Sequence, residues 1–351
     1  MRGDVPDIPE SDRADGCPHP RKVYSLIGHQ KAEHRFIKAT SSGHMHHAWL
    51  LSGGPGIGKA TLAYRMIRSI LGGQSRLQTS LDIPDSDPVA QRIESLGHGD
   101  FLLVRRPYDR KTGKLRSEIP VAEARRVSEF FSKRASEGGW RVCLIDCLDE
   151  MNHNGENAIL KTLEEPPERA VLILITHNPG RLLPTTRSRC LYLPLREVPS
   201  ADIRVWLGTY AKGSTEPTKE LAVQLSRGAP GRALALTRNA KTVLEPIRHI
   251  LERHGRRETA LDMRWVDNLS TVQNRYVRSL FWEALQDVIA ACARTAGGVG
   301  WELPLVQPEL NSVSRWIDYW KKIRHLQSCE AELNMDRKVV MMDALGNMPM
   351  P

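Results

Sequence analysis

The chain has 351 residues, of which 40% are hydrophobic, and a formal net charge of +9. This length predicts two or three domains with a sizeable core. The apolar runs fall far short of the ~20 residues that a transmembrane helix needs, which excludes a membrane protein and predicts a cytoplasmic one. The six cysteines include no Cys-x-x-Cys pair, so we expect reduced thiols and no zinc or other metal site.

Residues 1–20 contain prolines, glycines and five acidic against two basic residues, with little to bury. This composition is typical of a disordered or loosely attached tail. The segment lacks the positive n-region and the apolar h-region of a secretory signal. We therefore expect the first folded domain to begin at residue 21.

Five short apolar runs follow, and helix-length segments separate most of them. They are Ala48–Ser52, Phe101–Val104, Val142–Ile145, Val171–Thr176 and Leu191–Leu193. Their nearly continuous Val, Ile and Leu content is typical of buried parallel strands. The pattern predicts an α/β domain over residues 21–198 with a doubly wound, five-stranded parallel sheet. Between residues 72 and 99, clusters of turn residues predict a long insertion.

A glycine-rich segment, GGPGIGKA at residues 53–60, follows the first predicted strand and precedes a helix. In this context such a loop directs backbone N–H groups at phosphates, and Lys59 would reach the outer ones. The next residue normally supplies a hydroxyl to Mg²⁺, but here it is Ala60. Thr61 comes one position late, about 100° further round the helix. We therefore expect ATP binding to be weak or vestigial.

The second candidate element is Val142–Asp146, an apolar strand that ends in a carboxylate able to approach a metal. In ATPases of this class an adjacent Glu acts as general base, but Cys147 follows here. Asp149 and Glu150 are interpreted as the opening of the next helix, with Asp149 as a replacement base left as an alternative. The predicted degenerate nucleotide site consists of Gly53, Gly58, Lys59, Thr61 and Asp146.

Arg189 lies directly before the last predicted strand, where its side chain would emerge at the margin of the sheet. An arginine presented to the γ-phosphate of a neighbouring subunit can accelerate hydrolysis by roughly 10³ to 10⁵. We name Arg189 as the candidate arginine finger, with an ordinary surface ion pair as the alternative.

A basic stretch between the second predicted strand and the next helix comprises Arg105, Arg106, Arg110, Lys111, Lys114 and Arg116. We interpret it as an exposed loop, with a DNA-binding role as the alternative. The histidines at positions 44, 46 and 47 lack a further ligand at useful spacing, so no metal site is predicted there.

Strand signals stop after residue 199. Two short helical patterns between residues 201 and 239 predict a small helical lid over residues 199–241. From residue 242 to residue 351 helical periodicity predicts an all-α domain. Trp316, Trp320 and Ile323 recur on one face of a late helix, and we interpret this stripe as core, with a subunit interface as the alternative.

Several motifs, in this order along the chain, resemble the AAA+ subunits of bacterial sliding-clamp loaders. They are Ile27–Gln30, His46–Leu50, Gly139–Val142, Asn157–Pro167 and Ser188–Cys190. Together they cover most of residues 23–240. The resemblance implies an AAA+ P-loop domain, a small lid and a helical collar that holds a ring together.

In that family the ATP-hydrolysing subunits carry a hydroxyl after the P-loop lysine, an Asp-Glu pair and a four-cysteine zinc module between the two motifs. This sequence has none of the three. The resemblance therefore implies a non-motor, stator-like subunit of the DNA polymerase III holoenzyme, a DNA-directed DNA polymerase (nucleotidyltransferase) assembly. It implies no ATPase activity of its own. The alternative is an active AAA+ ATPase motor of a clamp-loader or helicase-loader complex.

The resemblance also assigns partners and further site residues. The implied partners are motor subunits, a delta-type subunit, the sliding clamp and primed DNA, in a hetero-oligomeric ring. Arg189 would complete the ATP site of an adjacent motor subunit. Thr176, His177 and Asn178 would occupy the sensor strand. Arg232 would be a lid sensor one position away from the family's usual place.

Overall fold

The computed structural model describes residues 10–13, 17–41, 45–72, 80–137, 139–252, 259–272, 275–299, 313–332 and 335–346. Among these residues, no helix is long and apolar enough to span a membrane. The chain divides into two compact units. The first contains residues up to 206 together with 228–231, and the second contains residues 207–227 together with those from 232 onward.

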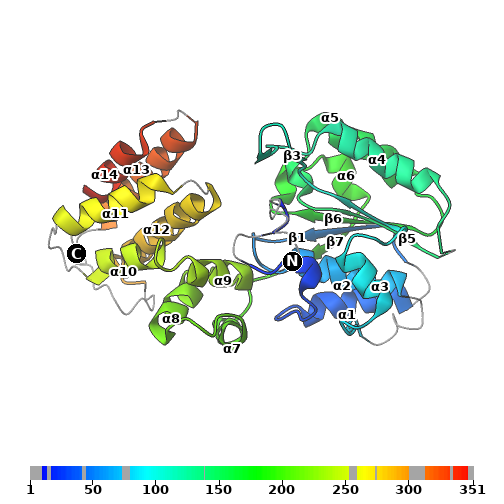
Figure 1. Cartoon of the computed structure of the whole chain (residues 1–351), viewed down its shortest axis with the longest axis horizontal. Helices are drawn as coiled ribbons and strands as arrows, with labels where there is room; N and C mark the ends of the chain where they lie inside the picture. Colours follow the sequence, from blue (N-terminus) through cyan, green and yellow to red (C-terminus); the bar gives the residue numbers. More distant parts are fainter. Residues whose placement is uncertain are drawn as a thin grey trace, which may run out of the picture. The chain divides into compact units, whose positions relative to one another are not determined.

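A five-stranded parallel sheet lies at the centre of the first unit (Figure 1). Its strands are β1 (Ala48–Ser52), β2 (Phe101–Val104), β5 (Arg141–Ile145), β6 (Ala170–Thr176) and β7 (Leu191–Pro194). They are ordered β2-β5-β6-β1-β7, so the first strand of the chain, β1, lies between the last two, β6 and β7. The predicted α/β fold with five parallel strands is confirmed.

Helices cover both faces of this sheet (Figure 1). On one face lie α1 (Gln30–Ser41), α2 (Lys59–Leu71) and α3 (Pro88–Glu94). On the other lie α4 (Val121–Ser132), α5 (His153–Glu164) and α6 (Pro184–Ser188). Successive side chains of a strand point to opposite faces, so Trp49 and Leu51 pack into the first layer and Leu50 into the second. Burial on both faces explains why the strands read as continuous apolar runs.

Short elements connect these layers. They are the 3-10 helices η1 (Pro20–Lys22), η3 (Leu148–Glu150) and η4 (Pro179–Arg181) and the two-stranded hairpin β3 (Tyr108–Asp109) with β4 (Lys114–Leu115). The predicted insertion between residues 72 and 99 contains α3, and residues 73–79 lie outside the described residues.

The hairpin accounts for the basic stretch. Arg105 and Arg106, at its start, form ion pairs with acidic side chains of other segments. Arg110, Lys111 and Lys114 are exposed on the hairpin itself. The predicted exposed loop is therefore observed for part of the basic stretch. A role of this stretch in binding DNA stays a prediction.

The second unit is helical. Its elements are the end of α7 (Ser200–Tyr210), α8 (Glu216–Gln224), most of α9 (Pro230–Arg238), α10 (Leu244–Glu252), α11 (Thr259–Thr271), α12 (Arg275–Ala296), α13 (Val313–Glu332) and α14 (Arg337–Gly346). The two helices predicted between residues 201 and 239 are corrected to three, α7, α8 and α9. Helices this short have too few turns for periodicity to separate them. The boundary between the predicted lid (199–241) and collar (242–351) stays a prediction.

The aromatic stripe of α13 is largely core, as we interpreted it. Trp316 is 1% exposed and Ile323 is fully buried. Trp320 is half-buried, and the guanidinium carbon of Arg324 lies 4.9 Å from the centroid of its ring. A guanidinium at this distance is attracted by the negative face of the indole.

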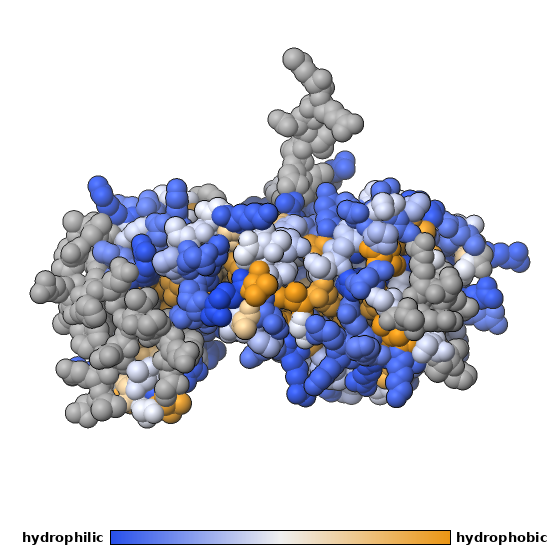
Figure 2. Space-filling view, turned by 90° about the horizontal axis from the view of Figure 1, so that it is seen from below, coloured by the Kyte–Doolittle hydropathy of each residue, from blue (hydrophilic) through white to orange (hydrophobic). Residues whose placement is uncertain are grey.

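Polar residues dominate the coloured part of the face shown in Figure 2. Figure 2 shows a mostly hydrophilic face on which apolar side chains gather only in small patches. Exposed apolar side chains include Val205 on α7 and Val339 on α14. Scattered residues of this kind are normal at a protein surface.

The N-terminal segment differs from the prediction of a disordered tail over residues 1–20. Residues 10–13 and 17–19 pack against the first unit, where Glu10 and Asp12 form ion pairs with Arg105. The prediction is therefore wrong for these residues, whereas residues 1–9 and 14–16 lie outside the described ones. Composition could not reveal the contact, because Arg105 lies 93 residues from Asp12 along the chain.

Candidate functional site

The glycine-rich segment forms the predicted loop between β1 and α2. Gly53, Gly56 and Gly58 have φ values of 150°, 74° and 115°, which residues with a Cβ rarely adopt. A Cβ at Gly53 would also lie 2.8 Å from the carbonyl oxygen of Leu195. Because α2 begins at Lys59, the loop presents backbone N–H groups at a helix N-terminus. This geometry fits the phosphates of a nucleotide.

Lys59 is turned into this loop. Its ammonium group donates hydrogen bonds to the carbonyl oxygens of Gly53 (2.7 Å) and Gly54 (2.8 Å). The residue is 4% exposed, and burial lowers the pKa of Lys59 to about 8, although the nearby Cys147 and Asp146 oppose that shift. A lysine so placed is able to exchange carbonyl oxygens for phosphate oxygens.

The side of the site that would hold Mg²⁺ fits less well. Asp146 follows β5 and is 6% exposed. Burial, together with the charge of Asp12, raises the pKa of Asp146 to about 7, against the opposing effects of Cys147 and Lys59. Ala60 has no hydroxyl, and Thr61 is one residue further along α2. A partly protonated carboxyl without a hydroxyl partner is a poor set of ligands for Mg²⁺. No three His, Cys, Asp or Glu side chains of the described ranges are arranged to hold a metal ion.

Cys147 pairs with a histidine where a general base would be expected. Its Sγ lies 3.3 Å from Nδ1 of His177, just beyond the end of β6. Burial, and then the charge of Asp146, raises the pKa of the Cys147 thiol well above its ordinary value. Burial, and then the charge of Lys59, lowers the pKa of His177 to about 4. Both groups are therefore neutral at physiological pH, and neither replaces a carboxylate base.

The predicted sensor residues lie at the same edge of the sheet. Thr176 ends β6 and is fully buried, and its hydroxyl oxygen accepts a hydrogen bond from the backbone N–H of Asn178 (3.1 Å). The side-chain oxygen of Asn178 caps η4 by accepting from the N–H of Gly180 (3.1 Å). Asp149, the alternative base, accepts from the N–H of His177 (3.1 Å). The sensor roles stay predictions.

Arg232 is engaged within the second unit. It is 8% exposed, and its guanidinium forms ion pairs with Glu283 and with Asp287 (3.0 Å), both on α12. Its Nε also donates to the carbonyl oxygen of Leu225 (3.0 Å). These contacts stabilise the helical unit, and a nucleotide-sensing role of Arg232 stays a prediction.

The residue before it, Gly231, contacts the phosphate loop. Its N–H donates to the carbonyl oxygen of Gly56 (2.9 Å). A Cβ at residue 231 would lie 3.0 Å from that oxygen and 3.1 Å from the Cα of Gly56. Glycine at residue 231 therefore permits the close approach of two backbones.

Arg189 follows α6 and has a side chain 34% exposed. Its Nη1 donates to the carbonyl oxygen of Thr185 (2.9 Å), and its Nη2 lies 2.9 Å from Oε1 of Glu164. The guanidinium is thus held at the protein surface, near the start of the edge strand β7. This position is compatible with both predicted roles, the arginine finger and the surface ion pair.

Residues 28–199 match the family model described as "DNA polymerase III, delta subunit". Over this segment the chain is similar to the delta' subunits of DNA polymerase III. These findings support the predicted resemblance.

The relatives include both delta' and gamma subunits of DNA polymerase III. The chain is 31% identical to the DNA polymerase III subunit delta' of Escherichia coli over 202 residues, which are 58% of each chain. It is 32% identical to the subunit delta' of Pseudomonas aeruginosa over 217 residues, or 62% of this chain and 60% of the relative. It is 28% identical to a subunit gamma of Buchnera aphidicola over 249 residues, or 71% and 64%. The similarity thus spans less than two thirds of the length of these relatives.

A solved structure with a similar fold is a gamma subunit-related protein of Thermotoga maritima. It is 18% identical, covers 91% of this chain and 98% of its own, and superposes with a TM-score of 0.43. With so low a score, the assignment of the fold rests on the sheet order described above.

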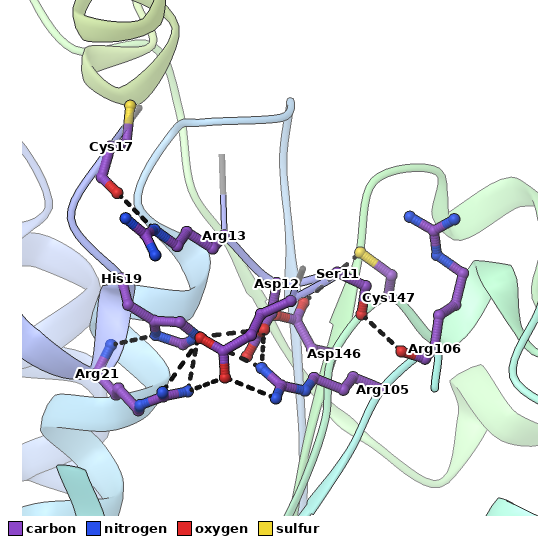
Figure 3. Close-up of polar contacts among 11 residues, drawn as sticks. Ser11, Asp12, Arg13, Cys17, His19, Arg21, Arg105, Arg106, Asp146 and Cys147 are labelled. Carbon is purple, nitrogen blue, oxygen red and sulfur yellow. Dashed lines mark hydrogen bonds and ion pairs between the residues drawn. The ribbon is translucent and has the colours of Figure 1, made fainter. Parts of the chain in front are cut away.

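Sequence reasoning missed the residues that surround Asp146. Figure 3 shows Asp12, His19, Arg21 and Arg105 linked in one network of polar contacts beside Asp146. The excess of acidic residues in the first twenty was the available signal, but it did not identify their partners.

Proposed function

We propose that this chain is a non-motor subunit of the DNA polymerase III clamp loader that presents Arg189 to an adjacent motor subunit. The observation that carries the proposal is the neutral pair of Cys147 and His177 in the place of a general base. With Ala60 instead of a hydroxyl residue, the chain lacks both the metal partner and the proton acceptor that hydrolysis needs. Similarity to the delta' subunits of DNA polymerase III supports the proposal.

The proposed partners follow from the same family. They are motor subunits of the gamma or tau type, a delta-type subunit, the sliding clamp and primed DNA, in a hetero-oligomeric ring that loads the clamp during replication. Arg189 contributes positive charge to the outer phosphate of a nucleotide bound by the neighbour.

The competing proposal is an ATPase motor, which the 28% identity to the gamma subunit favours. The phosphate loop and Lys59 would suit it. Release of phosphate by the purified chain separates the two proposals. We expect no turnover above background, whereas turnover within the usual enzyme range that Lys59→Ala abolishes would establish the motor.

The arginine finger is tested in the reconstituted complex. Arg189→Ala should leave the complex associated while lowering its DNA-stimulated ATPase, because hydrolysis at the one neighbouring site would slow by a factor of roughly 10³ or more. Arg187→Ala is the matched control, because Arg187 is exposed on the preceding turn of α6. Equal rates for the two variants in an intact complex would reject the assignment.

A further inference from the structure

Part of the N-terminal segment lies across the candidate nucleotide site. We name residues 10–13 and 17–19 the N-terminal strap (Figure 3). Glu10 lies 2.8 Å from nitrogens of both Arg21 and Arg105. Asp12, whose side chain is 1% exposed, forms ion pairs with Arg105 and with His19 (3.1 Å). The strap is therefore held by charged contacts that are mostly buried.

Its contacts connect it to the groups that would surround a nucleotide. Ser11 donates a hydrogen bond to the carbonyl oxygen of Arg106 (3.1 Å), just beyond β2. The ring of His19 meets the ring of Tyr64 on α2 edge-on, with centroids 6.2 Å apart. The thiol of Cys17 contacts the carbonyl oxygen of Gly231, 3.9 Å away. Because Gly231 is hydrogen-bonded to Gly56, one residue connects the strap to the phosphate loop.

The strap also brings negative charge to this site. Burial works against the charge of Asp12, but His19 and Arg105 hold the pKa of Asp12 below its ordinary value, so it is ionised. Its charge acts on Asp146 directly. One oxygen of Asp12, Oδ2, is buried and has no hydrogen-bond partner among the described residues. A nucleoside triphosphate entering the site would meet this carboxylate, and like charges at close range repel strongly where water is excluded.

Arg21 and Arg105, by contrast, carry positive charges that would attract an anionic ligand if they were free. Guanidinium groups bind carboxylates and phosphates with the same fork geometry, so a side chain that holds Glu10 and Asp12 is equally suited to an anionic ligand. In this structure both guanidinium groups are engaged by the strap. The acidic side chains of the strap therefore exclude an anion in two ways, by repulsion and by engaging Arg21 and Arg105.

We propose that the N-terminal strap is a built-in competitor of nucleotide, and that a nucleoside triphosphate enters the degenerate phosphate loop only when Glu10 and Asp12 leave Arg21 and Arg105. The proposal does not depend on the arginine finger or on the identity of the partners. It concerns contacts within this chain alone.

Binding of ATP to the purified full chain tests the competition. The double variant Glu10→Gln/Asp12→Asn removes two charges from the strap, and Asp85→Asn/Glu129→Gln removes two from exposed positions as the matched control. In a titration with a fluorescent ATP analogue, the strap variant should bind about tenfold more tightly or better than wild type and control. Its affinity should be the same with Mg²⁺ or EDTA, because Ala60 supplies no hydroxyl. Equal affinity of the strap variant and the control would overturn the proposal.

Labelling of Cys17 tests the displacement and does not require a variant. Cys17 is 6% exposed, so it should react slowly with a maleimide in the wild-type chain. Saturating ATP should accelerate its labelling severalfold, as followed for this cysteine by mass spectrometry. In the strap variant the labelling should be fast without ATP. If the strap variant does not fold, the wild-type measurement decides, and an unchanged rate at an ATP concentration that saturates binding refutes the proposal.

Discussion

Arg189 and Glu164 form an ion pair between different elements, with Nη2 of the arginine 2.9 Å from Oε1 of the glutamate that ends α5. Both side chains are substantially exposed, at 34% and 47%. Exposed pairs contribute only about 0–1 kcal/mol to stability. Arg189 can therefore leave Glu164 for a stronger anionic partner at little cost.

This relationship leads to a prediction for Glu164. Glu164→Gln should change the free energy of unfolding by less than about 1 kcal/mol. In the reconstituted complex it should preserve most of the DNA-stimulated ATPase that Arg189→Ala removes. A loss as large as that of Arg189→Ala would mean that Arg189 depends on its ion pair for its position.

The central strand β6 should be sensitive to truncation. Ile173 is fully buried between β1 and β5, so Ile173→Ala should destabilise the first unit by about 2–5 kcal/mol through lost apolar burial and a cavity. Val205→Ala, at a side chain 78% exposed, should stay within about 0.5 kcal/mol. Urea unfolding followed by circular dichroism measures both, and similar midpoints would contradict the packing described.

The close approach of Gly231 to the phosphate loop predicts a cost for a methyl group. Gly231→Ala should destabilise the first unit by about 1–3 kcal/mol, because its Cβ would lie 3.0 Å from the oxygen of Gly56. Gly208→Ala is the control, since a Cβ there meets nothing within 4 Å on α7. That change should stabilise by up to about 1 kcal/mol through helix propensity. Thermal unfolding of the two variants should shift in opposite directions.

His29 should make stability depend on pH. Its Nε2 lies 2.8 Å from the carbonyl oxygen of Ile57, and burial lowers the pKa of His29 against the opposing effects of this hydrogen bond and of Glu33. The unfolded chain binds a proton below about pH 6.5, whereas the folded chain does so only at lower pH. Stability should therefore fall as pH drops below about 6.5.

The contribution of His29 to the pH dependence of stability is measured by comparing the wild type with variants. His29→Gln keeps a hydrogen-bond donor but does not titrate, so its free energy of unfolding should fall less than that of the wild type between pH 7 and pH 5. His34→Gln, at an exposed position of α1, is the control and should keep the wild-type slope. Parallel curves for all three proteins would show that His29 is not the group responsible.

The sheet and the phosphate loop could be predicted because their signals are local. The five apolar runs lie within a residue or so of the strand ends observed, since burial on both faces requires uninterrupted apolar residues. The missing hydroxyl at Ala60 and the missing carboxylate at Cys147 could be read from the sequence alone, because each is a matter of which residue occupies the position. The three short helices α7, α8 and α9 were harder to predict, because each has too few turns for its apolar residues to show a helical period.

By itself, the sequence determined the fold class, the phosphate loop and the absence of the usual hydroxyl and glutamate beside it. Only the tertiary structure decided that Cys147 pairs with His177, that Arg189 pairs with Glu164 and that Asp12 meets Arg105. These partners come from segments far apart in the chain, and the sheet brings the ends of its strands together at one edge. Local periodicity and composition carry no information about such pairs, because they are formed by the packing of the whole unit.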